Sequence, residues 1–282
     1  MEVRELNHES VLSLLPDRAS EGHKGSFGKL LLLCGSRGYT GAAYLAAMGA
    51  LRCGAGLVFL GVPESIYGIE ACKLNEPVVF PLPQRDGMLS REAIPEIRER
   101  LQRADGVLIG CGLGQSEDTL SVVKTVLREA GCPVVLDADG INVLAPHKDI
   151  LRGRAHPTIL TPHEGEFLRF GGTLSGDKMA CASRYALEWN SIVVLKGHRS
   201  CITDGKTGYV NPTGNPGMAV GGSGDVLAGM ITALLGQGLA PLEAAAAGCW
   251  LHGGAGDLCA RELGQYGMLP TDMLSVLPRL LK

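Results

Sequence analysis

The sequence predicts an α/β fold with a central, mostly parallel β-sheet flanked by helices on both faces. Short apolar runs without polar alternation recur along the 282 residues, and such runs are typical of strands buried on both faces. Segments of helical length separate these runs, and alternating strands and helices favour parallel pairing. No Pro/Ser-rich linker or convincing repeat divides the chain. We therefore expect a single domain over residues 1–282.

The predicted elements follow one another along the chain. In the first half we expect strands at 29–35, 56–61, 77–80 and 106–110, and helices at 42–53, 64–72, 90–103 and 116–130. In the second half we expect extended runs at 133–137, 158–163 and 192–197, and helices at 164–170 and 176–190. A hairpin over 200–211, turning at Asp204-Gly205, precedes two buried helices between 226 and 256.

Bulk properties argue against several kinds of partner. The net charge of -3 gives no support for binding to nucleic acid or to an anionic membrane. The nine cysteines form no Cys-x-x-Cys pair, which is typical of reduced thiols and predicts neither a zinc site nor a disulfide framework. The polar N-terminus lacks the apolar core of a signal peptide, and polar residues interrupt the longest apolar stretch. We therefore expect a cytoplasmic protein that does not enter a membrane.

Unusual sequences cluster where the predicted strands end. In open α/β sheets the ligand crevice lies beyond the carboxyl ends of the strands. Glycine is abundant, at 40 residues, and many glycines fall at such ends. Six segments should share this edge: 35–41, 110–114, 137–142, 161–163, 196–200 and 221–225. Their common placement predicts one active site.

The last of these segments is a glycine-rich turn before a helix. Gly221, Gly222, Ser223 and Gly224 lead into Asp225 and an apolar run. Free N–H groups at a helix start can hold a phosphoryl group, and an adjacent carboxylate can act as a base. Alternatively, Asp225 caps the helix, a common role for aspartate. The five other segments at the same edge favour the catalytic role.

Well-known catalytic motifs are absent. Gly35-x-x-Gly38-x-x-Gly41 has the wrong spacing for a dinucleotide-binding fingerprint, and no Walker-type phosphate loop occurs. Neither a Gly-x-Ser-x-Gly elbow nor a His-Glu-x-x-His pair is present, which leaves serine hydrolase and zinc protease activities without support.

Three further groups at the predicted edge have two interpretations each. Lys196 either is a solvated strand end or opens a loop that binds nucleotide phosphates. His163 either starts a helix or contacts substrate. Asp137 and Asp139 either order the water of a bound Mg²⁺ or cap the following helix.

Nine collinear motifs together resemble one family over nearly the whole chain. The motifs are His23-Lys-Gly25 with Gly28, Gly35-Ser-x-Gly-Tyr-Thr-Gly-Ala-Ala43, Gly54-Ala-Gly-Leu-Val58, Gly110-x-Gly-Leu-Gly114, Asp137-Ala-Asp139, Leu160-Thr-Pro-His163, Val194-Leu-Lys-Gly197, Asn211-Pro-Thr-Gly-Asn215 and Gly221-Gly-x-Gly-Asp-x-Leu-Ala-Gly229. With these motifs the sequence resembles the ADP/ATP-dependent NAD(P)H-hydrate dehydratases, the carbohydrate kinase-like YjeF C-terminal domain within the ribokinase-like superfamily.

Departures from the family pattern are small. Ser223 replaces a usual Thr, Glu164 a frequent Pro and Gly140 a usual Ala, and none of these changes removes a group on which the assignment depends. The epimerase domain that some relatives carry at the N-terminus is expected to be absent.

The resemblance implies a repair reaction on hydrated NADH or NADPH. A nucleotide, ADP or ATP, would phosphorylate the ring hydroxyl of the S-epimer with Mg²⁺ as cofactor, and the phosphate would then leave. By the family pattern the hydrate contacts Ala42, Gly112, His163 and the catalytic base Asp225. The nucleotide would contact Lys196, Gly197, His198, Arg199, Ser200 and Gly224. The resemblance assigns no metal ligand.

Other functions predict different observations. A ribokinase-like kinase acting on a small alcohol would share the turn and the base but keep its product phosphorylated. A nucleotide-sensing protein without activity would be expected to lose the base, whereas Lys196, Gly224 and Asp225 are all present. We also expect a homo-oligomer, with a tetramer as one option, in which the Ala/Gly-rich stretch 244–256 packs against a neighbour.

Overall fold

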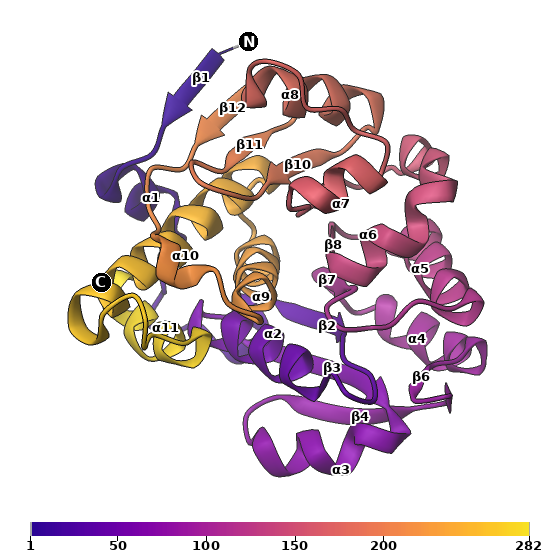
Figure 1. Cartoon of the computed structure of the whole chain (residues 1–282). Coiled ribbons are helices and arrows are strands. Elements are labelled where there is room, and N and C mark those ends of the chain that lie inside the picture. The colour runs from indigo at the N-terminus through magenta and orange to yellow at the C-terminus, as the bar shows by residue number, and fades with distance from the viewer. Residues whose placement is uncertain (1, 282) are drawn as a thin grey trace.

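The computed structural model describes residues 2–281 and contains a ten-stranded sheet (Figure 1). The strand order is β1-β12-β11-β10-β9-β8-β7-β2-β3-β4. Among these strands β11 runs antiparallel to β10 and β12, and every other neighbouring pair is parallel. The predicted α/β class with a mostly parallel sheet is confirmed.

The predicted strands and helices occur in the predicted order along the chain. The sheet strands are β1 (Glu2–Glu5), β2 (Lys29–Leu33), β3 (Leu57–Pro63), β4 (Val78–Leu82), β7 (Gly106–Ile109), β8 (Val134–Leu136), β9 (Thr158–Leu160), β10 (Ile192–Leu195), β11 (Cys201–Thr203) and β12 (Thr207–Val210). The helices are α1 (His8–Leu14), α2 (Thr40–Arg52), α3 (Glu64–Lys73), α4 (Ile94–Leu101), α5 (Glu117–Glu129), α6 (Ala138–Leu144), α7 (Glu164–Arg169), α8 (Lys178–Glu188), α9 (Ser223–Gly236), α10 (Pro241–Leu263) and α11 (Pro270–Val276).

The apolar strands bury side chains on both faces of the sheet. In β2, Leu30 and Leu32 enter one core, whereas Leu31 and Leu33 enter the other. This division follows from the two-residue period of a strand, and it explains why the run is apolar throughout. Helices α2, α9 and α10 cover the first core, and α4, α5 and α8 cover the second (Figure 1).

Several elements are missing from the sequence prediction. Strand β1 is exposed at all four residues and joins the sheet by parallel pairing with β12, so no apolar pattern marks it. A small hairpin of β5 (Gln84–Arg85) and β6 (Met88–Leu89) is too short to show a period. Helix α1 is a short amphipathic segment with one buried residue, Val11.

Small residues allow the helices of the first core to approach closely. A Cβ on Gly229 of α9 would collide with the carbonyl oxygen of Ala46 in α2. The stretch 244–256 of α10 is buried within this chain from end to end. The expectation that this stretch packs against a neighbouring copy is therefore wrong, because its small side chains serve packing inside the chain.

Most of the cysteine side chains lie inside the protein. All nine cysteines are free thiols, eight of them buried and only Cys72 exposed. None of the helices within residues 2–281 combines the length and the apolar character that a bilayer crossing requires.

Gly229→Ala should destabilise the fold by about 1–3 kcal/mol, because the added methyl group overpacks the contact between α9 and α2. Gly68→Ala is the matched control: Gly68 lies inside α3 and a Cβ there would meet open space, so a gain of roughly 0.5–1 kcal/mol is expected. Urea unfolding of both variants measures these changes, and equal effects would contradict the close approach.

Candidate active site

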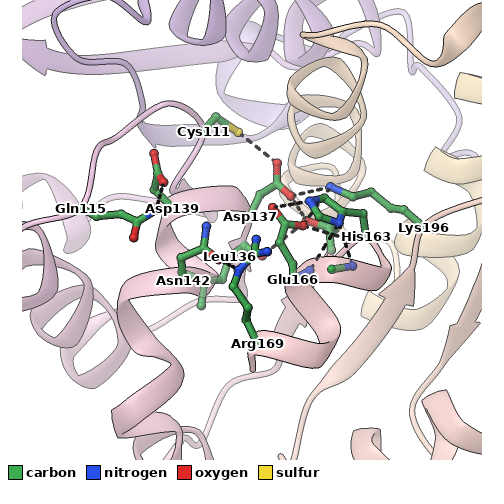
Figure 2. Close-up of polar contacts among 12 residues, drawn as sticks. Cys111, Gln115, Leu136, Asp137, Asp139, Asn142, His163, Glu166, Arg169 and Lys196 are labelled. Atoms are coloured by element: carbon green, nitrogen blue, oxygen red, sulfur yellow. Dashed lines mark hydrogen bonds and ion pairs between the residues drawn. The ribbon is translucent and has the colours of Figure 1, made fainter. Parts of the chain in front are cut away.

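The segments predicted to share one edge of the sheet do meet there. The N–H of Gly35 donates to the carbonyl of Cys111 over 2.8 Å, which joins the ends of β2 and β7. The Thr161 hydroxyl donates to the Asp137 carboxylate over 2.6 Å, which joins the ends of β9 and β8. Lys196, at the end of β10, reaches the same carboxylate (Figure 2). The shared edge is thus a connected set of polar groups.

An ion pair between Asp137 and Lys196 lies at the centre of this edge. The Asp137 side chain is 2% exposed, and its Oδ1 accepts from the Lys196 ammonium over 2.9 Å. The carboxylate of Glu166 lies 3.8 Å from the same ammonium. Burial alone would lower the pKa of Lys196, but these two carboxylates outweigh burial and hold the pKa above its ordinary value. Lys196 is therefore a fixed cation, and the alternative of a solvated strand end is wrong.

Asp225 lies beside this pair in the first turn of α9. One oxygen of Asp225, one of Asp137 and the sulfur of Cys111 lie within 4.8 Å of one another. Burial raises the pKa of the Asp225 carboxyl to about 7, and the charge of Asp137 acts in the same direction. The residue at the cap position of α9 is Gly222, and no side chain makes a capping bond there. Asp225 is thus free of the capping role and titrates near neutral pH.

Several backbone N–H groups at the start of α9 are available to an anion. Within residues 2–281 no hydrogen-bond acceptor is present for the N–H groups of Gly222, Gly224 and Asp225. A Cβ on Gly224 would lie 3.3 Å from the Lys196 ammonium, so the turn and the cation are adjacent. Ser223 is turned inward, with its hydroxyl 3.3 Å from the buried His252, while Gly221 is exposed. The turn offers backbone donors and not the serine hydroxyl.

Two predicted substrate contacts, Ala42 and Gly112, lie against each other. Gly112 has a φ of 58°, and a Cβ there would lie 2.7 Å from the Cβ of Ala42 and 2.9 Å from that of Tyr39. The Ser36 hydroxyl donates to the Gly112 carbonyl over 2.8 Å and fixes this contact. Glycine is therefore required at position 112 both for its backbone conformation and for space.

His163 has the helix-start role that was one of its two predicted roles. It is the N-cap of α7, and its Nδ1 accepts from the N–H groups of Gly165 (3.0 Å) and Glu166 (3.3 Å). The side chain is still 55% exposed, with Nε2 3.5 Å from Glu166. The helix-start role is observed, and the exposed ring leaves substrate contact as a prediction.

The predicted nucleotide loop is short and open. Gly197, His198 and Arg199 are exposed, and the Ser200 hydroxyl donates back to the Gly197 carbonyl over 3.0 Å. The guanidinium of Arg199 pairs with Glu5 of β1 at 3.3 Å, so the structure directs this side chain away from the loop.

Lys178 is a cation of this loop that sequence reasoning missed. Its ammonium lies 3.5 Å from the Lys196 carbonyl and 3.3 Å from Glu164. A Cβ on Gly197 would lie 2.7 Å from the same ammonium. No pattern within α8 marks Lys178, because its role depends on the neighbouring loop.

Helix α10 holds the segment that leads into the turn, which the sequence did not show. Both oxygens of Asp257 accept from this segment over 2.9 Å, from the Gly214 N–H and the Asn215 amide. The ring of His252 lies 2.9 Å from the Ser223 carbonyl, and burial lowers the pKa of His252 to about 4, so the ring is neutral at pH 7. Two features of the sequence could have indicated these contacts: the Asn211–Asn215 motif, and the presence of polar residues in the otherwise apolar helix α10.

The two aspartates after β8 do not cap α6 with their side chains. Asp137 stands at the N-cap position but makes no capping bond. The carboxylate of Asp139 accepts from the Gly114 N–H and the Gln115 amide, each over 2.9 Å. The capping alternative is therefore wrong, and contact with Mg²⁺ through water stays a prediction.

The sheet order and the glycine-rich turn at its carboxyl edge define a ribokinase-like fold. A solved ribokinase-like superfamily protein from Enterococcus faecalis V583 is 28% identical, with a TM-score of 0.88 over 99% of this chain and 95% of that chain. A Bacillus subtilis ADP/ATP-dependent NAD(P)H-hydrate dehydratase, co-crystallised with ATP/Mg²⁺, has a TM-score of 0.85 at 32% identity, covering 99% of this chain and 98% of that chain.

The sequence model of the NAD(P)H-hydrate dehydratase family matches residues 30–279. The ADP-dependent (S)-NAD(P)H-hydrate dehydratase of Bacillus subtilis is 36% identical over 100% of this chain and 99% of its own length. The chain belongs to this family. It spans about half the length of the bifunctional NAD(P)H-hydrate repair enzymes that it also matches, 52% for that of Moorella thermoacetica at 47% identity over 96% of this chain.

Asp225→Asn should stabilise the fold at neutral and alkaline pH. The pKa of about 7 in the folded state exceeds the unfolded value of roughly 3.9, so the folded state alone binds a proton between these values. Stability from this group is present below about pH 4 and is lost as the pH rises through about 7. The advantage of the variant should grow across this window to on the order of 1–3 kcal/mol, after allowance for solvent screening.

Urea unfolding at about pH 5 and about pH 8 measures this change. A stability difference between the two proteins that stays constant with pH would contradict the shifted titration of Asp225.

Proposed function

We propose that this chain catalyses the ADP- or ATP-dependent dehydration of the S-epimer of hydrated NADH or NADPH, which restores the reduced nucleotide. The Bacillus subtilis relative is named an ADP-dependent (S)-NAD(P)H-hydrate dehydratase. The observation that carries the proposal is the Asp225 carboxyl, with a pKa of about 7, set beside Lys196 and the free N–H groups of the turn. These are the parts that phosphoryl transfer to a hydroxyl group requires.

Asp225 would act as the general base on the ring hydroxyl of the hydrate. A carboxyl with a pKa near the working pH is ionised often enough to accept the proton and basic enough to favour the transfer. The oxygen would then bond to the phosphorus of the donor as the bond to the leaving nucleotide breaks. The carbon–oxygen bond of this ester can then break, because phosphate leaves with the bonding electrons where hydroxide cannot, and loss of a proton from the adjacent ring carbon restores the double bond.

The turn and Lys196 would stabilise the charge of the transferring phosphoryl group. The free N–H groups of Gly222, Gly224 and Asp225 stand at a helix N-terminus, where the helix dipole also favours negative charge. Lys196 is held beside Gly224 by its pair with Asp137, so it needs little rearrangement on binding. The loop after Lys196, with Lys178 beside it, would hold the rest of the nucleotide.

The donor set at this edge fits Mg²⁺. The ion prefers oxygen ligands, retains several waters and binds substrate phosphates. The oxygens of Asp137 and Asp139 already accept hydrogen bonds from protein donors, so these residues would hold the ion through its waters. When bound, Mg²⁺ would neutralise negative charge on the nucleotide phosphates.

The organisation of the protein is part of the same proposal. We propose one domain over residues 1–282, as in the relative that matches the whole chain. A cytoplasmic location agrees with the free thiols. ADP as the preferred donor agrees with the name of that relative. A homo-oligomer, with a tetramer as one form, is supported by the exposed apolar side chains Leu263, Tyr266 and Leu269. Sedimentation velocity tests the oligomeric state.

Asp225→Asn should reduce turnover of hydrated NADH by about 10²–10⁴-fold and leave nucleotide binding largely intact, because it removes the base and not the N–H donors. Recovery of NADH absorbance with Mg²⁺ and either ADP or ATP is the assay, and it also identifies the donor. The wild-type rate should rise with pH through an apparent pKa of about 7. Near-normal turnover by the variant would overturn the role of Asp225.

Asp149→Asn is the matched control, since Asp149 is a surface carboxylate whose side chain is 84% exposed. It should retain wild-type turnover. Accumulation of a phosphorylated alcohol without release of phosphate would instead identify the chain as a small-molecule kinase.

A further inference from the structure

Arg169, the last residue of α7, is an oriented cation that the proposed mechanism does not use. Its Nε donates to the side-chain oxygen of Asn142 over 3.0 Å (Figure 2). Within residues 2–281, its two terminal nitrogens meet no hydrogen-bond acceptor and no carboxylate lies within ion-pairing distance. The guanidinium is therefore fixed by a neutral amide and keeps its full charge for another partner.

The carboxylates of α7 near Arg169 interact with other groups. Glu164 lies 3.3 Å from the ammonium of Lys178. Glu166 accepts from the N–H of His163 over 2.9 Å and lies 3.8 Å from Lys196. Neither glutamate neutralises Arg169, although both belong to the same helix.

Arg169 lies next to His163, across a gap that glycine leaves open. A Cβ on Gly165 would lie 2.9 Å from the imidazole Cε1 of His163 and 3.4 Å from a terminal nitrogen of Arg169. Any larger residue at position 165 would fill the space between the ring and the guanidinium. One small, exposed surface site is thus bordered by the imidazole of His163, the guanidinium of Arg169 and the amide of Asn142.

We propose that Arg169, with Asn142 and His163, forms a subsite for a phosphate group of the hydrated dinucleotide, an inference that rests on the proposed function. A planar guanidinium with free terminal N–H groups matches two phosphate oxygens at once. The substrate carries two kinds of phosphate: the pyrophosphate, common to both forms, and the 2′-phosphate of the NADPH form alone. Arg169 is therefore a substrate-binding residue separate from the nucleotide loop at 196–200.

Arg169→Gln should raise the KM for hydrate roughly ten- to hundredfold, the usual effect of losing a charged hydrogen-bond pair, with kcat nearly unchanged. Arg169→Lys keeps the positive charge but lacks the two parallel N–H donors of a guanidinium, so an intermediate KM for the hydrate is expected. The KM for ADP should not change in either variant. Arg128→Gln, at an exposed position on α5, is the matched control and should behave as wild type.

Separate measurements with hydrated NADH and hydrated NADPH distinguish the two phosphates. A loss confined to the NADPH form places the 2′-phosphate on Arg169, and an equal loss with both places the pyrophosphate there. An unchanged hydrate KM in an active enzyme, or a rise in the KM for ADP instead, overturns the subsite.

Direct binding of NADPH, followed by its fluorescence, separates failure of the subsite from failure of the proposed function. If the wild type shows no turnover, the function fails, yet a weaker NADPH affinity in Arg169→Gln still supports the subsite and an equal affinity overturns it. Absence of any dinucleotide binding by the wild type overturns both.

Discussion

The ion pair between Asp137 and Lys196 is the interaction on which the rest of the site depends. It links the ends of β8 and β10 across the sheet, and it holds the Lys196 ammonium next to Gly224 in the first turn of α9. Burial is the largest cause of the high pKa of Asp225, and within the pair the charge of Asp137 raises this pKa further while Lys196 lowers it. Removing either partner would leave a buried charge uncompensated, which is strongly destabilising in proteins. One contact therefore contributes both to the arrangement of the site and to the protonation of Asp225.

Helix α10 supports the turn from the other side. Asp257 holds the segment before the turn, and His252 holds the first carbonyl of α9. The close approach depends on small residues, because a Cβ on Gly253 would collide with the backbone of Thr213. The turn before α9 is thus positioned by residues of a helix for which the sequence analysis predicted only packing.

The sequence predicted the sheet and the edge at which its polar segments meet, because both follow from local patterns. Apolar runs such as the one in β2 are marked by burial on both faces, and glycines and aspartates mark the strand ends. It did not predict β1, which pairs through its backbone without burying a side chain. It also missed Lys178 and the orientation of Arg169, since long flexible side chains can reach partners in many directions. Their contacts exist only once distant segments have packed.

The position of β1 has a consequence for how the chain folds. Glu2 pairs with Thr207, so β1 cannot pair until about 200 further residues have been synthesised. At ribosomal speeds of roughly 5–20 residues per second, this synthesis takes tens of seconds or less. Pairing over such a distance in sequence is slow to form. Until it forms, β12 presents an open edge to other nascent chains. Once it forms, the new edge carries Glu2, Arg4 and Glu5, and charged edge strands resist joining a second sheet. Strand β1 thus protects this edge of the sheet from aggregation, but only after β12 has been synthesised.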